Sequence, residues 1–490
     1  MDTQTVSVPR TETPTTTALK PNALGVMGIL FFVLSGQAPL TGIAGAAPIS
    51  VAMGNGAGTP AAYLLAGIVI LLFSVGFVAM GRHVVDAGAF YTYIGAGLGR
   101  TVGAGSASVA LAAYCAIQAA MYGLYGATVS ALVADHTPLD LPWWVCALVT
   151  MAVVQGLGAA GIEMGARVLA VFVLAEFGVL LAFGLVTLFA GGGPEGLGAA
   201  ESFSPSAALQ GAPGVAVMFA VASMFGFEAT AIYGEEARDA RRTVPRATYL
   251  SVVVVTGFFA FISWMLISAH GASKAPAEAR EALASGDSSG FVFGPVADQF
   301  GGWVDGVLPV LLATSLFAGI LTFHNSANRY LFSLGRDGQL PAALCRLNSR
   351  RSPWIAGCVQ SAAALVLVMP FALAGQDPVL TLFSWLSGLA VLAMMLLYLL
   401  TSVSVVVYFR RRREDTRTWN TLVAPVLGSM GLAGAIWLIL ANFTTLIGGE
   451  GGTAAWLVLS VPLVMTVGAA NERVRRRRPN TPPPPVDRAA

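Results

Sequence analysis

Two acidic side chains stand inside long apolar runs of the sequence, where an ionisable group is costly and usually has a function. Glu176 lies in the middle of ARVLAVFVLAEFGVLL, and Glu228 ends the motif MFGFE. A buried carboxyl such as Glu176 can bind and release a proton that is coupled to another process, or it can stay protonated and tie two helices together. Glu228 can contact a cationic ligand group or relay its presence, or it can cap a helix start, which attracts negative charge.

The first apolar run is interrupted by SGQAPLTG at residues 35–42. Ser35 and Gly36 suit the end of one half-helix, and Pro39 suits the first turn of a second one, because its missing N–H is not needed there. Backbone groups without partners are costly in lipid, so such a break persists where it lines a cavity or binds a ligand. The alternative is a simple kink, since glycine and proline are common in membrane helices.

A second interruption lies at Gly226, in the motif MFGFE at residues 224–228 of the sixth apolar run. Paired interruptions in matching helices of two halves indicate a binding site between them. The half-helix that begins at Pro39 would attract a carboxylate, and the carbonyl ends near Ser35 and Met224 would attract an ammonium group. The two breaks together predict a site for a small zwitterion such as an α-amino acid.

Aromatic side chains form a second group of candidates. Tyr114, Gln118, Tyr122 and Tyr125 of the third run are spaced by four, four and three residues, so they fall roughly on one helical face. Such a face lines a pocket or packs against another helix. Beside the second break, Phe225 is a candidate for a ring that covers the ligand.

These groups must be positioned in lipid, because the chain has the composition of a membrane protein. Of its 490 residues, 56% are hydrophobic and 11% are charged, against about 45–50% and about 25% in soluble domains. One crossing takes about 20 mainly apolar residues. Twelve helices of this kind are expected, at 23–52, 60–80, 104–133, 142–160, 167–190, 211–233, 247–269, 303–334, 355–374, 379–409, 422–446 and 453–470.

Basic residues predict how the chain is oriented. If the N-terminus is cytoplasmic, all but two of the 27 lysines and arginines fall in cytoplasmic segments, as the positive-inside rule requires. The exceptions, Lys274 and Arg280, lie in the 271–302 connection, which is long enough for a helical external lid. Both termini are therefore expected in the cytoplasm, with disordered tails at 1–20 and 471–490, and the protein in the plasma (inner) membrane. The second tail is basic and rich in proline.

Several kinds of chemistry are excluded or disfavoured. The four cysteines and four histidines are scattered, without the spacing of a metal site or a disulfide framework. Only two lysines occur and neither follows a glycine, which excludes the phosphate-binding loop of ATPases. Thr314 and Ser315 of the eighth run offer hydroxyls to a cation, but they do not predict a sodium site. A carrier, a channel and an intramembrane enzyme remain, and no paired catalytic residues favour the enzyme.

Three stretches resemble the amino acid–polyamine–organocation (APC) family of transporters. They are AGAFYTYIGAGLGR (87–100), MFGFEATAIYGEEARDARRTVPRA (224–247) and FAGILTFHNSANRYLFSLGRDGQLP (317–341). The resemblance, which extends from Pro21 to Ala470, implies an all-α membrane protein of about 12 transmembrane helices with a LeuT-like fold. Its two inverted five-helix repeats would span 21–190 and 211–409, helices 1 and 6 would be broken, and two appended helices would span 422–470.

The resemblance also implies the residues of the site. Carried over by position, the backbone of Gly36, Gln37 and Ala38 would contact a carboxylate. The amine would be contacted by Leu34, Ser35, Phe225 and Gly226, with Phe227 and Glu228 beside them and with Tyr114 and Gln118 as side-chain candidates. The first break departs from the family's G-S-G-I-F pattern, having Ser35, Gly36, Gln37, Ala38 and Pro39 instead. Gln37 could reach a polar ligand or bond to another helix.

The expected function is alternating-access transport of an amino acid, neutral or modestly polar, by proton-coupled symport or by exchange. Glu176 and Glu228 are the candidates for coupling. A cationic amine or polyamine is the alternative substrate, and a channel and an intramembrane enzyme are the remote alternatives. Protons and the lipid bilayer are expected partners, whereas no cofactor, metal or nucleic acid is expected.

Overall fold

Helices form most of the described chain. The computed structural model describes residues 25–84, 90–160, 166–228, 230, 237–336, 338–350, 352–448 and 451–477. Within these residues there is no β-strand, and one isolated bridge joins Gly193 and Gly196. The expected N-terminal tail, and residues 478–490 of the expected C-terminal tail, lie outside the described residues.

In the described part of the chain, nine helical stretches are long and apolar enough to cross a membrane. They are Gly56–Gly81, Arg100–His136, Val171–Phe189, Arg241–His270, Trp303–Arg336, Trp354–Leu373, Pro378–Arg412, Trp419–Leu446 and Gly451–Arg476. Three shorter apolar stretches are Pro39–Met53, Trp143–Ala159 and Pro213–Ala222. Each of these stretches overlaps one of the spans expected from the sequence, and two of the short ones border the predicted breaks.

The first half of the chain contains α1 (Val26–Gln37), α2 (Pro39–Thr41), η1 (Gly42–Ala46), α3 (Ala47–Met53), η2 (Gly56–Gly58), α4 (Thr59–Gly81), α5 (Phe90–Leu98), α6 (Arg100–His136), α7 (Trp143–Ala159), α8 (Ala166–Phe189), α9 (Ala199–Phe203), α10 (Pro205–Leu209) and α11 (Pro213–Ala222). The second half contains α13 (Ala240–His270), α14 (Ala275–Ala284), α15 (Gly290–Phe300), α16 (Trp303–Arg336), η4 (Ala342–Cys345), α17 (Trp354–Leu373), η5 (Pro378–Phe383), α18 (Ser384–Arg412), η6 (Trp419–Val423), α19 (Ala424–Leu446) and α20 (Gly451–Arg477).

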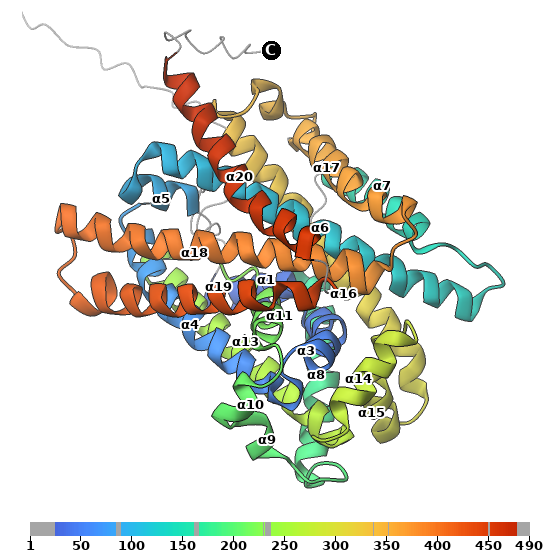
Figure 1. Ribbon diagram of the computed structural model, residues 1–490. Coiled ribbons are helices and arrows are strands. Elements are labelled where there is room, and N and C mark those ends of the chain that lie inside the picture. Colours follow the sequence, from blue (N-terminus) through green and yellow to red (C-terminus); the bar gives the residue numbers. More distant parts are fainter. Residues whose placement is uncertain are drawn as a thin grey trace, which may run out of the picture.

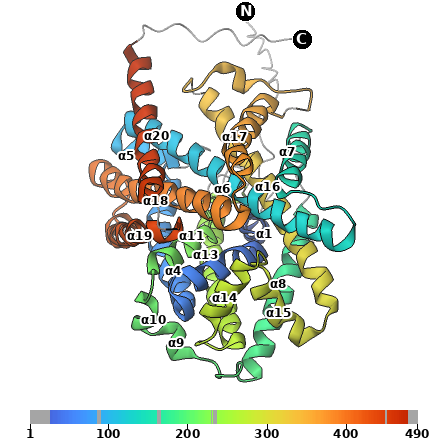
Figure 2. The same ribbon diagram turned by 45° about the vertical axis from the view of Figure 1, so that its right-hand side comes forward.

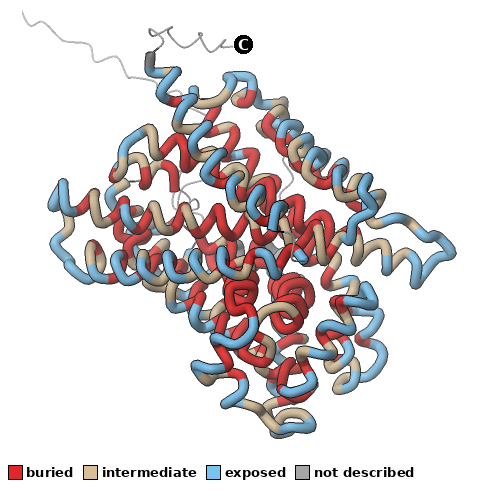
Figure 3. The backbone as a smooth tube through the Cα atoms, viewed as in Figure 1, coloured by how far each residue is buried: buried red, intermediate tan, exposed pale blue. Residues whose placement is uncertain are grey.

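The short helices α1 and α11 lie in the middle of the bundle, where the longer helices surround them (Figures 1 and 2). α1 packs against α8, α13 and α16, while α11 packs against α4, α18 and α19. Burial follows this arrangement, with buried residues in the middle and exposed ones on the outer faces (Figure 3). Large apolar side chains such as Val366 of α17 and Trp456 of α20 are exposed, as expected of faces that contact lipid rather than water.

The last helix is longer than the sequence predicted. α20 ends at Arg477, whereas the span was expected to end at residue 470 and to be followed by a tail. Glu472 forms ion pairs with Arg475 and Arg476, each at 2.9 Å. Pairs at these spacings lie on one helical face and stabilise the helix, which accounts for the additional turns beyond the apolar run.

Candidate functional site

The first apolar run is divided at Ala38. α1 ends at Gln37, Ala38 adopts the left-handed conformation with φ 45° and ψ 74°, and α2 begins at Pro39. The sequence placed the end of this half-helix at Ser35 and Gly36, slightly too early. The residue before a proline is the one that is disfavoured in the helical conformation, so α1 continues to Gln37 and the break falls on Ala38. The side chain of Ser35 lies outside the described part of the structure.

The sixth run is divided at the other predicted position. α11 ends at Ala222, and the turn at residues 223–228 contains Gly226 at φ 106°. Because L side chains rarely adopt this conformation, glycine is the residue that fits. Beyond Glu228, only Thr230 is described before residue 237.

The two breaks are in contact. The side-chain amide of Gln37 donates a hydrogen bond to the carbonyl oxygen of Met224, with a donor–acceptor distance of 3.1 Å. A Cβ atom placed on Gly226 would lie 3.7 Å from Gln37 Cγ and 3.8 Å from the carbonyl carbon of Gly36. The turn after α11 therefore packs directly against the last residues of α1.

A cavity of about 40 Å³ lies between the breaks. Its walls come from both breaks and from α6, α16, η5 and α18: Gly36, Gln37, Ala38, Thr41, Gly42, Ala46, Ile117, Met121, Ala222, Ser223, Phe225, Phe323, Phe383 and Ser387. Two buried polar atoms of this wall, Gln37 Oε1 and Ser387 Oγ, have no hydrogen-bond partner among the residues that the structure describes. Because buried polar groups are normally paired, these atoms indicate where a bound polar molecule would be held.

Glu176 reaches the first break from α8. Its side chain is 2% exposed. Its Oε2 accepts hydrogen bonds from the Leu40 N–H at 3.1 Å and from the Ser315 hydroxyl at 2.8 Å. Thr41 Oγ1 lies 3.5 Å from the Ser315 hydroxyl. Glu176 thus occupies the start of α2, the position that the sequence suggested for a ligand carboxylate, and it connects three separate helices.

Glu228 acts within the second break. Its Oε2 accepts a hydrogen bond from the Gly226 N–H at 3.0 Å and one from the Tyr398 hydroxyl at 3.4 Å. Phe227 turns away from the cavity and packs against the rings of Phe73 and Tyr398, with centroids 6.0 and 5.5 Å away. Neither Glu228 nor Phe227 is among the residues that line the cavity.

The third-run candidates lie outside the cavity wall as well. Gln118 Oε1 accepts a hydrogen bond from Gln360 of α17, and Gln118 Nε2 donates to the Tyr122 hydroxyl at 3.4 Å. The ring of Tyr114 packs against Phe323 and Tyr330. The part of α6 that does face the cavity carries Ile117 and Met121. Leu34, expected near the amine, is buried in α1 and does not line the cavity.

The amino acid permease family matches residues 24–469, which is most of the chain. The chain belongs to the amino acid permease family. This confirms the resemblance to the APC family that the sequence motifs carried. It also makes the protein a multi-pass membrane protein, in agreement with its apolar helices.

Three relatives of this permease have names that describe what they carry. It is 22% identical to the serine/threonine exchanger SteT of Bacillus subtilis over 388 residues, which are 78% of this chain and 82% of SteT. It is 24% identical to the branched-chain amino acid permease BcaP of Lactococcus lactis over 233 residues, 46% of this chain and 44% of BcaP. It is 31% identical to the mouse Asc-type amino acid transporter 1 over 137 residues, 27% of this chain and 24% of that protein. The last two matches thus span less than half of those relatives.

Two short helices of the permease lie beside the first broken helix: α14 packs on α3, and α15 contacts η1. The 271–302 connection, predicted to form a lid, folds into α14 and α15. Arg280 Nε donates a hydrogen bond to the Ala52 carbonyl at 3.1 Å. At the base of the connection, hydrogen bonds from Ser273 hold the pKa of Glu195 below its usual range. The second half of the first broken helix is therefore in contact with α14.

Most of this site was not assigned to it from sequence: of the 14 residues that line the cavity, only Gly36, Gln37, Ala38 and Phe225 were expected there. Ser315 was considered for a cation site, not as a donor to Glu176. Phe383 and Ser387 belong to the tenth run, which showed no break and no charge. A signal did exist for this segment: Asp377 and Pro378 precede it, and Asp377 caps the start of η5 by accepting hydrogen bonds from the Val379 and Leu380 N–H groups.

Proposed function

We propose that the permease is a secondary active transporter that moves a small neutral or modestly polar amino acid by alternating access. The observation that carries this proposal is the cavity between the two helix breaks, where two buried polar atoms lack partners in the described part of the chain. The backbone carbonyls near Gln37 and in the turn after α11 suit an ammonium group. Because Glu176 occupies the start of α2, the Ser387 hydroxyl is the donor that faces the cavity and suits a carboxylate. The small volume favours a small substrate.

The alternative substrate, a cationic amine or polyamine, has less support. It was suggested by Glu176 and Glu228, but neither side chain lines the cavity. Both carboxyl groups accept a hydrogen bond from a backbone N–H at a break. The polar atoms that face the cavity belong to neutral side chains, and these suit a zwitterion better than a dication.

We propose that Glu176 is the coupling residue, with transport by proton symport or by exchange. Among the described residues, no basic side chain forms an ion pair with Glu176. A buried carboxylate without a counter-charge is costly, which favours proton uptake at this position. Protonation of Glu176 would in turn weaken the hydrogen bonds that its carboxylate accepts from α2 and α16. Glu228, which lies outside the cavity wall, is better explained as the cap of its own turn.

We also propose twelve crossings in a LeuT-like arrangement of two inverted five-helix repeats, 21–190 and 211–409, with the 422–470 pair appended. The order of helix lengths supports this. Each half begins with a broken helix, its third helix is long (α6 with 37 residues and α16 with 34), and its fourth is shorter (α7 with 17 and α17 with 20). The distribution of basic residues supports cytoplasmic termini and a plasma-membrane location.

A substrate screen tests the function. Purified permease is heated in detergent with each amino acid and with small amines, because a ligand of the folded state raises the unfolding midpoint. Compounds that stabilise the protein are then tested for counterflow in proteoliposomes. Stabilisation and counterflow by a small neutral amino acid are expected. Stabilisation by amines alone, or currents beyond carrier turnover without counterflow, would refute the proposal.

A matched pair of variants tests the site. Ser387→Ala removes the hydroxyl that faces the cavity. Ser402→Ala removes another buried hydroxyl of α18, which bonds to none of the described residues and does not line the cavity. A hydrogen bond contributes about 0.5–1.5 kcal/mol, so S387A is expected to weaken substrate affinity by about two- to tenfold. S402A is expected to leave it unchanged, and equal effects of both variants would place the substrate elsewhere.

A further inference from the structure

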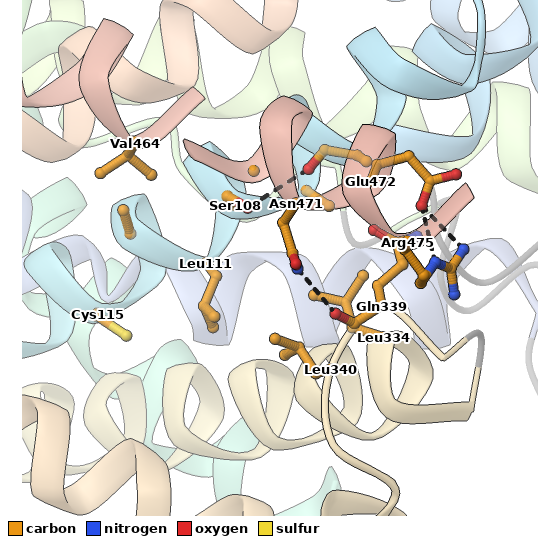
Figure 4. A pocket seen from close by; sticks show the side chains of 14 residues that line it. Ser108, Leu111, Cys115, Leu334, Gln339, Leu340, Val464, Asn471, Glu472 and Arg475 are labelled. Carbon is orange, nitrogen blue, oxygen red and sulfur yellow. Dashed lines mark hydrogen bonds and ion pairs between the residues drawn. The ribbon is translucent and has the colours of Figure 1, made fainter. Parts of the chain in front are cut away.

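A second cavity of the structure is lined by residues that lie far along the chain from both helix breaks. It has a volume of about 340 Å³ and is enclosed by α6, α20 and the end of α16 with the turn that follows it (Figure 4). The α6 wall consists mainly of small residues spaced by three or four positions: Ala104, Ala107, Ser108, Leu111, Ala112 and Cys115. Small side chains on one helical face leave a groove beside the neighbouring helix.

One end of this groove is charged. Asn471, Glu472 and Arg475 of α20 line it, and Glu472 pairs with both Arg475 and Arg476. One carboxylate therefore faces two guanidinium groups. The sequence places five arginines and one acidic residue at 472–478, so this end of α20 carries an excess of positive charge.

The groove has the length of one lipid leaflet. Its α20 wall extends from Val464 to Arg475, and its α6 wall extends from Ala104 to Cys115. Each of these stretches measures about 16 Å at a helical rise of about 1.5 Å per residue. Half of a hydrocarbon core about 30 Å thick is about 15 Å. A chain that began at the arginines would thus end near the middle of the bilayer.

The groove is also reachable from the lipid. α20 is a peripheral helix, and Leu463 and Val467, neighbours of the lining residues, are 60% and 61% exposed. Leu111 and Ala112 of the opposite wall are only partly covered. An acyl chain could therefore enter sideways without displacing a helix.

We propose that this groove is a binding site for an anionic phospholipid, whose phosphate contacts Arg475 and Arg476 and whose acyl chain lies along α6. Basic pockets between membrane helices are suited to such headgroups. The chain's own segment at 478–490 is a poor alternative occupant, because Asp487 is its single acidic residue and prolines make up much of it. The site is separate from the cavity between the breaks, and it does not depend on which amino acid is transported.

The experiment measures lipid binding to the purified full-length permease in detergent. The unfolding midpoint is followed as phosphatidylglycerol, phosphatidylcholine with the same acyl chains, or inorganic phosphate is added. The expected result is saturable stabilisation by phosphatidylglycerol at a concentration about tenfold lower than for phosphatidylcholine. Phosphate alone is expected to have no effect, because it lacks the acyl chain. Equal stabilisation by both lipids would overturn the proposal.

Matched variants locate the effect. R475Q/R476Q is expected to weaken phosphatidylglycerol binding by about tenfold or more, as each basic residue near the headgroups contributes on the order of fivefold. R473Q removes the same kind of charge from an exposed neighbour that neither lines the groove nor takes part in the two ion pairs of Glu472, and it is expected to change binding less than about threefold. If R473Q matches the double variant, general charge attraction explains the result and the site is rejected.

A second pair of variants tests the groove without touching the charges. A112L fills it from α6, and A131L adds the same volume to an exposed position of that helix. A112L is expected to abolish the preference for phosphatidylglycerol, whereas A131L keeps it. Because these two variants leave the ion pairs of Glu472 intact, they test whether the lipid binds in the groove even if R475Q/R476Q fails to fold. Unchanged binding in A112L would overturn the proposal.

Discussion

At each helix break a glutamate side chain accepts a hydrogen bond from a backbone N–H, but the two glutamates come from different places in the chain. At the first, the acceptor for the Leu40 N–H is Glu176, which lies 136 residues away on α8 and also accepts from Ser315 of α16. At the second, the acceptor for the Gly226 N–H is Glu228, two residues further along the same turn. The first set of bonds joins three helices, whereas the second cap closes within its own turn and has one longer bond to a distant helix, from the Tyr398 hydroxyl of α18 at 3.4 Å.

The two breaks also differ in the residue that adopts a positive φ. The left-handed residue of the first break is Ala38, at φ 45°, and that of the second is Gly226, at φ 106°. Alanine pays a steric cost in this conformation that glycine does not. The first break is therefore imposed by Pro39 and held by distant partners, while the second is built into its local sequence. A break held by distant partners is the better candidate for a part that responds to proton or substrate binding.

The largest effect is expected from Gly226→Ala. A Cβ atom there would meet its neighbours at 3.7–3.8 Å, which is ordinary contact, so the cost arises from the backbone conformation alone. Such strain amounts to about 1–3 kcal/mol. The unfolding midpoint and substrate affinity are both expected to fall. Gly257→Ala in α13, where an added Cβ meets nothing within 4 Å, is the control, and an equal loss in both variants would contradict this account.

Next in size is Glu176→Gln, which keeps an acceptor for Leu40 but cannot release a proton. One pH unit across the membrane corresponds to about 1.4 kcal/mol, or about tenfold accumulation of substrate. In the variant, substrate accumulation driven by a pH gradient should therefore fall about tenfold for each pH unit of the gradient. Counterflow, which needs no net proton movement, should persist. Uptake and counterflow are measured in the same proteoliposomes. Full accumulation by the variant would remove Glu176 from coupling and leave it the structural role.

The sequence predicted the positions of both breaks because proline and glycine act locally. Pro39 excludes its predecessor from a helix and Gly226 permits a positive φ, and both effects depend on neighbouring residues only. Ala38 carried no such signal, since alanine is a good helix former, so the end of α1 was placed too early. The additional turns of α20 were visible in the spacing of Glu472 with Arg475 and Arg476, but apolar periodicity alone ends the span at residue 470.

Partners across the bundle could not be predicted. The bond from Gln37 to the Met224 carbonyl joins residues 187 positions apart, and Ser387 meets the cavity from another helix. Gln118 seemed to belong to a pocket face, yet it is paired with Gln360 of α17. Helical spacing indicates which residues share a face, whereas the rotation of that face is set by the packing of the whole bundle.

A smaller effect, and one of opposite sign, is expected from Ala38→Gly. Relief of the left-handed alanine is worth about 1–2 kcal/mol, and the greater freedom of glycine in the unfolded chain costs about 0.5–1 kcal/mol. A gain of about 0.5 kcal/mol in unfolding free energy is the expected balance of these two terms. Ala47→Gly in the regular helix α3 is the control and should lose about 1 kcal/mol. A loss in both variants would mean that Ala38 is not strained.

The smallest effect is expected from Glu228→Gln, and it separates the two carboxyl groups most directly. The glutamine oxygen can still accept from the Gly226 N–H, and a neutral acceptor is weaker than a charged one by about 1 kcal/mol at most. Because Glu228 does not line the cavity, substrate affinity and pH-driven uptake should stay within about twofold of wild type. If E228Q instead loses pH-driven uptake and E176Q keeps it, Glu228 is the coupling residue and Glu176 has only a structural role.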